Sequence, residues 1–264
     1  MQRYPAQIET ETVGQGIIRL NEYDLANCFL VVGEEKACLI DTGAGVADLE
    51  KLIPSLTDKP LTVLITHAHA DHVGGAGWFR EAYVHPADLH AAKRYRRPFW
   101  RLYFLHCHPY KRKHHGIPFR TAFQKAHAVS FLPCEEGAVF PLGGREIEAF
   151  FTPGHSVGSL IFRDTLTGTV FTGDNVNPLV TLQYPGATTV GTWIAGASRT
   201  LQLAGGAPIW GGHGNTAIPQ ETIEKAVLLA QTLVDRGNGK TKKTGSVRGD
   251  EKYPCILYKE NRVL

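Results

Sequence analysis

Long apolar runs are missing from this sequence, although 43% of its 264 residues are hydrophobic. No stretch of eighteen apolar residues occurs, and a membrane-spanning helix needs about 20 of them. The N-terminal residues 1–5 also lack the apolar segment of a signal peptide. We therefore expect a cytoplasmic protein without a membrane span. The chain length predicts a single domain over residues 1–264.

Paired cysteines are missing as well. The five cysteines are odd in number, widely scattered and without a Cys-x-x-Cys pair: Cys28, Cys38, Cys107, Cys134 and Cys255. This pattern predicts reduced thiols in a cytoplasm rather than a disulfide framework. Cys28 and Cys38 are expected to be small, buried strand residues. No pattern supports a catalytic thiol.

Metal-ligand side chains, by contrast, are concentrated in residues 66–72. Four of them fall within six positions: His67, His69, Asp71 and His72. Neutral imidazoles and carboxylates suit zinc and similar cations. The run follows a predicted strand at 61–65, so His67 and His69 are expected to point to the same side. Asp71 and His72 come where the chain turns and can address a second position.

Three further segments repeat one arrangement, in which a short apolar strand and a glycine precede a single donor. Those donors are His155, Asp174 and His213. Loops at strand ends are where rigid scaffolds place chemistry. One such residue alone indicates only a cap or a satisfied polar group. Combined with the first run, the three predict a shared metal centre.

The order His-x-His-x-Asp-His, then His, Asp and His, resembles the metallo-β-lactamase-fold hydrolases. The likeness covers about residues 15–215 and is strongest to the glyoxalase II-like branch. It implies an α/β fold, specifically the four-layer αββα sandwich. It also implies two Zn²⁺ per chain, with iron or manganese as alternatives.

The resemblance also implies a role for each donor. His67, His69 and His155 would hold one metal, and Asp71, His72 and His213 the second, with Asp174 bridging the two. Asp41 in the run 39–43 and Thr66 would brace the metal loop from behind. A turn or helix-capping role for Asp41 is the alternative.

Departures from the family pattern reduce the number of candidate activities. Many true β-lactamases carry a cysteine where this chain has Asp174, so a dedicated β-lactamase is not expected. His69 stands where the flavodiiron oxidases of the same fold carry a glutamate, so an oxidase of that kind is not expected. Glyoxalase II proper carries a helical C-terminal extension that binds glutathione. This chain has only 51 residues after His213, and they contain one clear helix.

The remaining pattern predicts an α/β domain with strands at 17–20, 28–32 and 37–40 and a hairpin over 160–172. A helix is expected at 48–53, ending at Pro54. Further helices are expected at 194–203 and 220–234. Residues 236–250 are predicted to form a mobile loop before a last strand at 255–258.

Residues 88–127 differ from the rest of the chain. They contain ten Lys or Arg and a single acid, Asp88, which gives this segment a net charge of +9. Aromatic residues are interleaved with these cations. One hypothesis is a cap-like insertion whose cations, among them Arg94, Arg97 and Arg101, attract an anionic substrate. The alternative is a solvated helix pair that packs on the body or on a second subunit, which allows a homodimer.

The predicted function is dinuclear-metal-dependent hydrolysis of a thioester or a carboxylic ester such as a lactone. A metal-bridging hydroxide would attack the substrate, and Asp71 would transfer the proton to the leaving group. Asn177 or Tyr184 would donate to the developing oxyanion. The alternatives are a phosphodiesterase or nuclease of the same fold, for which nucleic acid would be the partner, and a mononuclear iron dioxygenase acting on persulfides. We expect a small anionic substrate.

Overall fold

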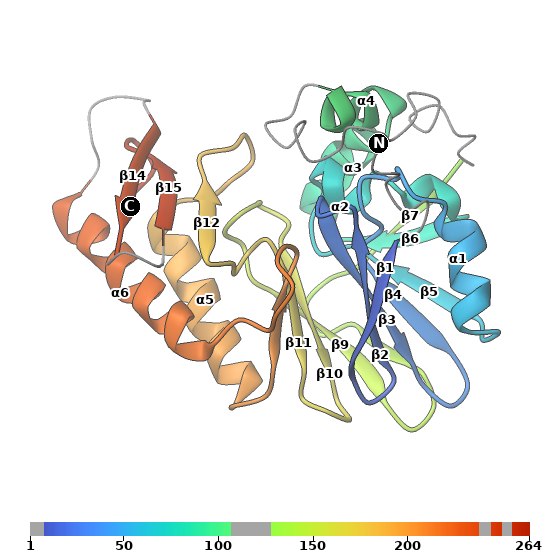
Figure 1. Cartoon of the computed structure of the whole chain (residues 1–264). Coiled ribbons are helices and arrows are strands. Elements are labelled where there is room, and N and C mark those ends of the chain that lie inside the picture. Colours follow the sequence, from blue (N-terminus) through green and yellow to red (C-terminus); the bar gives the residue numbers. More distant parts are fainter. Residues whose placement is uncertain (1–7, 107–127, 238–243, 250–254) are drawn as a thin grey trace, which may run out of the picture. The chain divides into compact units, whose positions relative to one another are not determined.

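The computed structural model describes residues 8–106, 128–237, 244–249 and 255–264 (Figure 1). The chain divides into two compact units. Unit 1 comprises residues 1–134 and 140–147, and unit 2 comprises residues 135–139 and 148–264. The prediction of one domain over 1–264 stays a prediction.

Unit 1 is built on a seven-stranded sheet in sequential order. Its strands are β1 (Glu9–Gly14), β2 (Ile17–Glu22), β3 (Ala26–Val32), β4 (Ala37–Ile40), β5 (Leu61–Leu64), β6 (Glu81–Val84) and β7 (Ser130–Pro133). Strands β1 to β4 pair antiparallel, and β4 to β7 pair parallel. The carboxyl ends of β4, β5 and β6 therefore meet at one edge of the sheet.

Short helices follow the parallel strands of unit 1 (Figure 1). They are α1 (Leu49–Leu56), α2 (Ala70–Val73), α3 (Leu89–Tyr95) and α4 (Pro98–His106), with 3₁₀ turns at Ala76–Trp78 and Pro86–Asp88. The core of unit 1 contains buried apolar side chains from the strands and from α1, such as Leu30, Leu39, Val63 and Ile53. Their burial is the main source of stability for this unit.

Unit 2 supplies most of a five-stranded sheet in the order β13-β11-β10-β9-β8. Its strands are β8 (Val139–Pro141), β9 (Glu146–Phe151), β10 (Leu160–Asp164), β11 (Val170–Gly173) and β13 (Ile209–Gly211). Strands β10 and β11 form the predicted hairpin, and β11 pairs parallel with β13. A smaller sheet joins β12 (Leu179–Leu182), β15 (Cys255–Lys259) and β14 (Thr244–Arg248).

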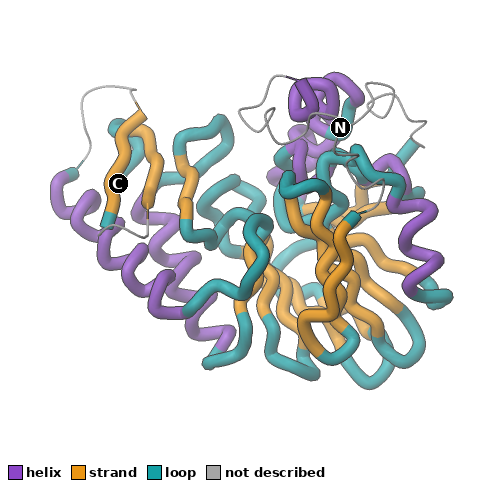
Figure 2. The backbone as a smooth tube through the Cα atoms, viewed as in Figure 1, coloured by secondary structure: helices purple, strands orange, loops and turns teal. Residues whose placement is uncertain are grey.

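Two long helices, α5 (Val190–Ala204) and α6 (Gln220–Arg236), pack side by side in unit 2 (Figure 2). Thr189 caps the N-terminus of α5, where its hydroxyl accepts a hydrogen bond from the Thr192 amide. The core of the unit contains Trp193, Ile223 and Ile256. Both helices extend beyond their predicted limits.

Two sequence predictions about secondary structure are wrong. Helix α1 does not end at Pro54 but continues through it to Leu56. Pro54 is exposed, so water can satisfy the carbonyl group that loses a helical partner. The predicted mobile loop contains β14, which pairs antiparallel with β15 from Thr244 to Arg248. Its Gly- and Thr-rich sequence shows no apolar alternation, and the cross-strand pairing provides the order.

The basic segment begins with α3 and α4, whereas residues 107–127 lie outside the described residues. The side chain of Arg101 is outside them too. Among the described helices, none combines the length and the apolar character required to cross a bilayer.

Candidate metal centre

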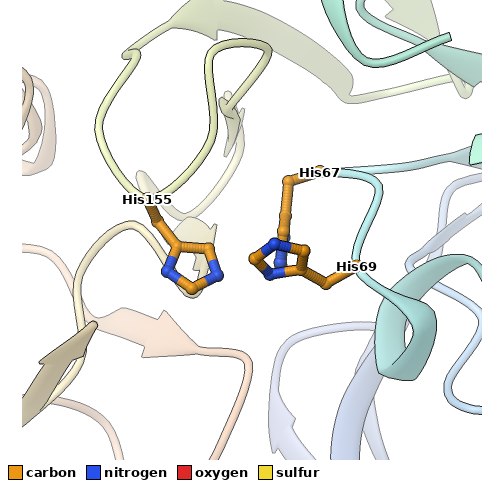
Figure 3. Close-up of side chains that lie close together, drawn as sticks. All are labelled: His67, His69 and His155. Atoms are coloured by element: carbon orange, nitrogen blue, oxygen red, sulfur yellow. The ribbon is translucent and has the colours of Figure 1, made fainter. Parts of the chain in front are cut away.

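His67 and His69 lie in the loop between β5 and α2 (Figure 3), and Asp71 and His72 lie on α2 itself. His67 and His72 are buried, and His69 and Asp71 are partly exposed. The rings of His67 and His69 meet edge to face with centroids 4.8 Å apart. The His67 and His72 centroids are 4.2 Å apart. Unit 1 thus gathers three imidazoles and a carboxylate on one short segment.

Asp41 braces this loop from the end of the neighbouring strand β4. Its Oδ1 accepts from the Thr66 backbone N–H at 2.8 Å. Its Oδ2 lies 2.8 Å from both the Thr66 hydroxyl, which donates to it, and His72 Nδ1. Thr66 Oγ1 in turn lies 3.1 Å from His67 Nδ1. One buried carboxylate therefore orients two imidazoles, directly and through a hydroxyl group.

These contacts determine the tautomers. A carboxylate only accepts hydrogen bonds, so His72 must carry its proton on Nδ1. The Thr66 hydroxyl proton points to Asp41, so its oxygen accepts from His67 Nδ1. In both rings the buried Nε2 atom then bears the lone pair that a metal requires.

Asp88, the single acid of the basic segment, braces the same loop from the other side. It follows β6, is buried, and its Oδ2 accepts from the Ala68 backbone N–H at 3.0 Å. The backbone between His67 and His69 is thereby fixed. The sequence analysis noted this acid but gave it no role. The signal that could have found it is the position of Asp88 after the next parallel strand.

Unit 2 brings together the three later donors. The carboxyl ends of the parallel pair β11 and β13 place Asp174 Oδ2 3.1 Å from His213 Nε2. His155 Nε2, from the loop after β9, lies 3.6 Å from the same oxygen. His155 Nδ1 lies 2.7 Å from the Thr181 carbonyl oxygen, so it donates and leaves Nε2 as the acceptor. Asp174 thus faces two imidazole nitrogens.

Asn175 and Asn177 support these donors from behind. Asn175 Oδ1 accepts from the His155 backbone N–H at 3.0 Å. The Asn177 amide donates to Asp174 Oδ1 at 3.0 Å, and Asn177 is buried. Asn177, predicted to contact substrate, is thus placed where it positions Asp174. Tyr184, the other predicted oxyanion donor, is exposed, and its ring centroid is 6.3 Å from that of His155.

The described cysteines have no visible catalytic role. Burial raises the pKa of Cys28 and of Cys38 well above the usual value, so both thiols remain protonated. Cys134 is a third buried free thiol, and Cys107 lies outside the described residues. Cys28 and Cys38 match the expectation of small buried strand residues.

A family model described as the metallo-beta-lactamase superfamily matches residues 23–209. The human acyl-coenzyme A thioesterase MBLAC2 is 27% identical over 210 residues, which are 73% of this chain and 75% of that protein. An atrochrysone carboxyl ACP thioesterase of Aspergillus terreus is 27% identical over 154 residues, covering 57% of this chain and 38% of that protein.

Solved structures show the same fold. A metallo-beta-lactamase from Pontibacter korlensis superposes with a TM-score of 0.63 at 18% identity, over 85% of this chain and 99% of that one. The protein TTHA1623, solved in a di-iron-bound form, has a TM-score of 0.56 and 26% identity, over 83% and 97% of the two chains. The predicted mixed α/β fold is confirmed. The closer resemblance to the glyoxalase II-like branch stays a prediction.

Proposed function

Because the chain belongs to the metallo-beta-lactamase superfamily, we propose that it is a metal-dependent hydrolase of acyl thioesters. The relatives named as thioesterases of coenzyme A and of a carrier protein support this substrate class. The observation that carries the proposal is the orientation of His67, His72 and His155, whose Nδ1 atoms each face an acceptor.

We assign the metal ligands among the seven predicted donors. Among the described residues, the candidate groups are His67, His69 and His155; His67, His72 and Asp174; and Asp71, His72 and His213. Their donors are neutral imidazoles and carboxylates, which fit Zn²⁺ and also Fe or Mn. Two ions per chain agree with the related protein solved with two irons. Asp174 is the proposed bridge.

Bound metal ions would supply Lewis acidity and a water of lowered pKa. The chain itself contributes orientation and proton transfer. Asp41 and Thr66 hold the imidazole rings in the ligating tautomer, and Asn177 holds the carboxylate of Asp174. Asp71 is partly exposed on α2, and we assign to it the proton transfer to the leaving thiolate. Tyr184 is exposed near His155 and is the candidate to contact the acyl oxygen.

The test combines metal analysis with a substrate panel. The purified protein, loaded separately with zinc, manganese or iron, would be assayed on an acyl-coenzyme A, a lactone, a phosphodiester and a persulfide with oxygen. We expect about two metal ions per chain and the highest kcat/KM on the thioester. Faster phosphodiester cleavage would favour the nuclease alternative. One iron per chain with oxygen uptake would favour the dioxygenase, and either result refutes the proposal.

A further inference from the structure

A cationic pocket lies on unit 1, apart from the metal donors. Its volume is about 370 Å³, and four residues line it: His90, Lys93, Arg94 and Arg97. The spacing i, i+3, i+4, i+7 puts them on one side of α3 and of the turn that follows it. All four side chains are exposed, while Ala92 on the same helix is buried. We call these four residues the cationic pocket.

Among the described residues, no acid balances the charges in the cationic pocket. Within the described part of the chain, no carboxylate forms an ion pair with Lys93, Arg94 or Arg97. Like charges so close together repel one another, and an anionic ligand relieves that repulsion. Guanidinium groups form paired hydrogen bonds with phosphate oxygens, so two arginines among the four favour a phosphate group.

Aromatic contacts connect the cationic pocket with the metal loop in the same unit. The Tyr95 ring centroid is 6.2 Å from that of His69. The Arg94 guanidinium carbon lies 5.7 Å from the Tyr95 centroid and 5.9 Å from that of Trp100. A ligand whose phosphates occupy the pocket can therefore extend along Tyr95 toward His69.

Exposed aromatic rings border this region. Phe99 is 66% exposed and Tyr103 is 37% exposed, and both rings contact Trp100 with centroids 5.5 and 5.9 Å apart. A large exposed aromatic beside cations is a surface on which a purine base can stack. Phosphate-binding cations and stacking rings together suit a nucleotide better than they suit the flat acidic face of a protein.

We propose that the cationic pocket binds the phosphorylated adenosine end of a coenzyme A thioester, while the acyl end reaches the metal donors. This inference rests on the proposed thioesterase function and specifies its substrate. An acyl group on a carrier protein lacks the adenosine phosphates and would leave this pocket unused.

Binding is tested without catalysis. Adenosine 3′,5′-bisphosphate would be titrated calorimetrically into the metal-free protein and into the double variant R94Q/R97Q. We expect affinity to fall about tenfold for each guanidinium removed, because hydrogen bonds to charged groups are strong. The matched control K36Q/R80Q removes two exposed cations of the same unit and should bind as the wild type does. Absence of binding to the wild type, or an equal loss in the control, overturns the proposal.

Kinetics then separate this inference from the proposed function. Wild type and R94Q/R97Q would be compared on acetyl-coenzyme A, on acetyl-pantetheine, which lacks the nucleotide, and on an acylated carrier protein. We expect R94Q/R97Q to have a higher KM than wild type for acetyl-coenzyme A but not for acetyl-pantetheine, with kcat unchanged. If neither thioester is hydrolysed but the bisphosphate binds, the function fails and the pocket assignment stands. If R94Q/R97Q impairs only turnover of an acyl carrier protein, the surface docks a protein and the nucleotide proposal is wrong.

Discussion

The carboxylate of Asp41 lies 2.8 Å from Nδ1 of His72, thirty-one residues later in the chain. Asp41 has a φ of 61°, in the left-handed region that few non-glycine residues adopt. This conformation comes directly after β4 and is held by contacts to Thr66 and to His72. Such strain persists where surrounding structure fixes it, commonly at functional sites. Asp41 therefore couples the local backbone to the orientation of the metal loop.

Replacing Asp41 with Asn should weaken metal binding while keeping the backbone. Asn tolerates a positive φ, so D41N isolates the loss of the carboxylate. Its single carbonyl oxygen cannot accept from the Thr66 amide, the Thr66 hydroxyl and His72 together. We expect metal affinity to fall about 10–100-fold, which is the usual effect of replacing a residue that hydrogen-bonds a metal-ligating histidine. Without metal, the unfolding free energy of D41N should be about 1–3 kcal/mol lower than that of wild type.

Competition with a chelating dye measures that affinity, and urea unfolding of the metal-free variant measures stability. Asp48 offers the control, since it caps α1 by accepting from Lys51 at 3.2 Å and Asn caps equally well. D48N should leave both quantities unchanged. Wild-type metal affinity in D41N would mean that Asp41 only stabilises the turn.

Replacing Gly211 with Ala should disturb Asp174 through Asn177. A Cβ atom at position 211 would lie 2.1 Å from Asn177 Oδ1, the side chain that holds Asp174. We expect a loss of about 1–3 kcal/mol from overpacking, together with weaker metal binding. Thermal unfolding and metal titration would report the two effects.

Gly191 is the matched control for that substitution. A Cβ atom there meets its nearest atom at 3.6 Å, which is ordinary contact, so G191A should not lower stability. Adding N177A to G211A should cost less than the two single changes together, since the clash is removed. Strict additivity would show that the glycine acts independently of Asn177.

The stability that Glu136 contributes should disappear at acid pH. Burial alone would raise the pKa of Glu136, but hydrogen bonds from Arg199 and the Phe151 amide, with the Arg199 charge, lower it below the ordinary 4.5. A lowered folded pKa means that the stabilisation is complete above the unfolded pKa and disappears as pH falls through the folded one. The Arg199 contacts are 2.6 and 3.0 Å.

E136Q should therefore be less stable than wild type near pH 7, by roughly 1 kcal/mol or less because the pair is partly solvated. The difference should shrink as pH falls below 4.5. Urea unfolding at several pH values measures it. Glu221, fully exposed and paired with Lys225, is the control, and E221Q should change little. A constant difference across this pH range would contradict the assignment.

The sequence predicted the donors because each group follows a recognisable strand: residues 67–72 follow β5 in one sheet, and His155, Asp174 and His213 follow β9, β11 and β13 in another. The bracing role of Asp41 was predicted from the family resemblance, with a turn or helix-capping role as the alternative. Asp88 and Asn177 received no positioning role, because their contacts with Ala68 and Asp174 depend on loop geometry that local pattern does not encode. Strand β14 was missed because its pairing with β15 is tertiary, and propensity alone favoured a loop.

Removing metal should destabilise the protein by a free energy that grows with the logarithm of metal affinity. A ligand that binds only the folded chain stabilises it by about 2.7 kcal/mol at a free concentration of 100 times its Kd. Calorimetry with excess zinc and then with chelator should show a clear fall in Tm for wild type. In H213Q, which lacks the imidazole whose Nε2 faces Asp174 Oδ2, that fall should be smaller, while the chelated forms unfold at similar temperatures. Equal zinc dependence in wild type and H213Q would mean that His213 is no ligand. If zinc, manganese and iron all leave the Tm of both proteins unchanged, the chain has no metal centre and the proposed function is wrong.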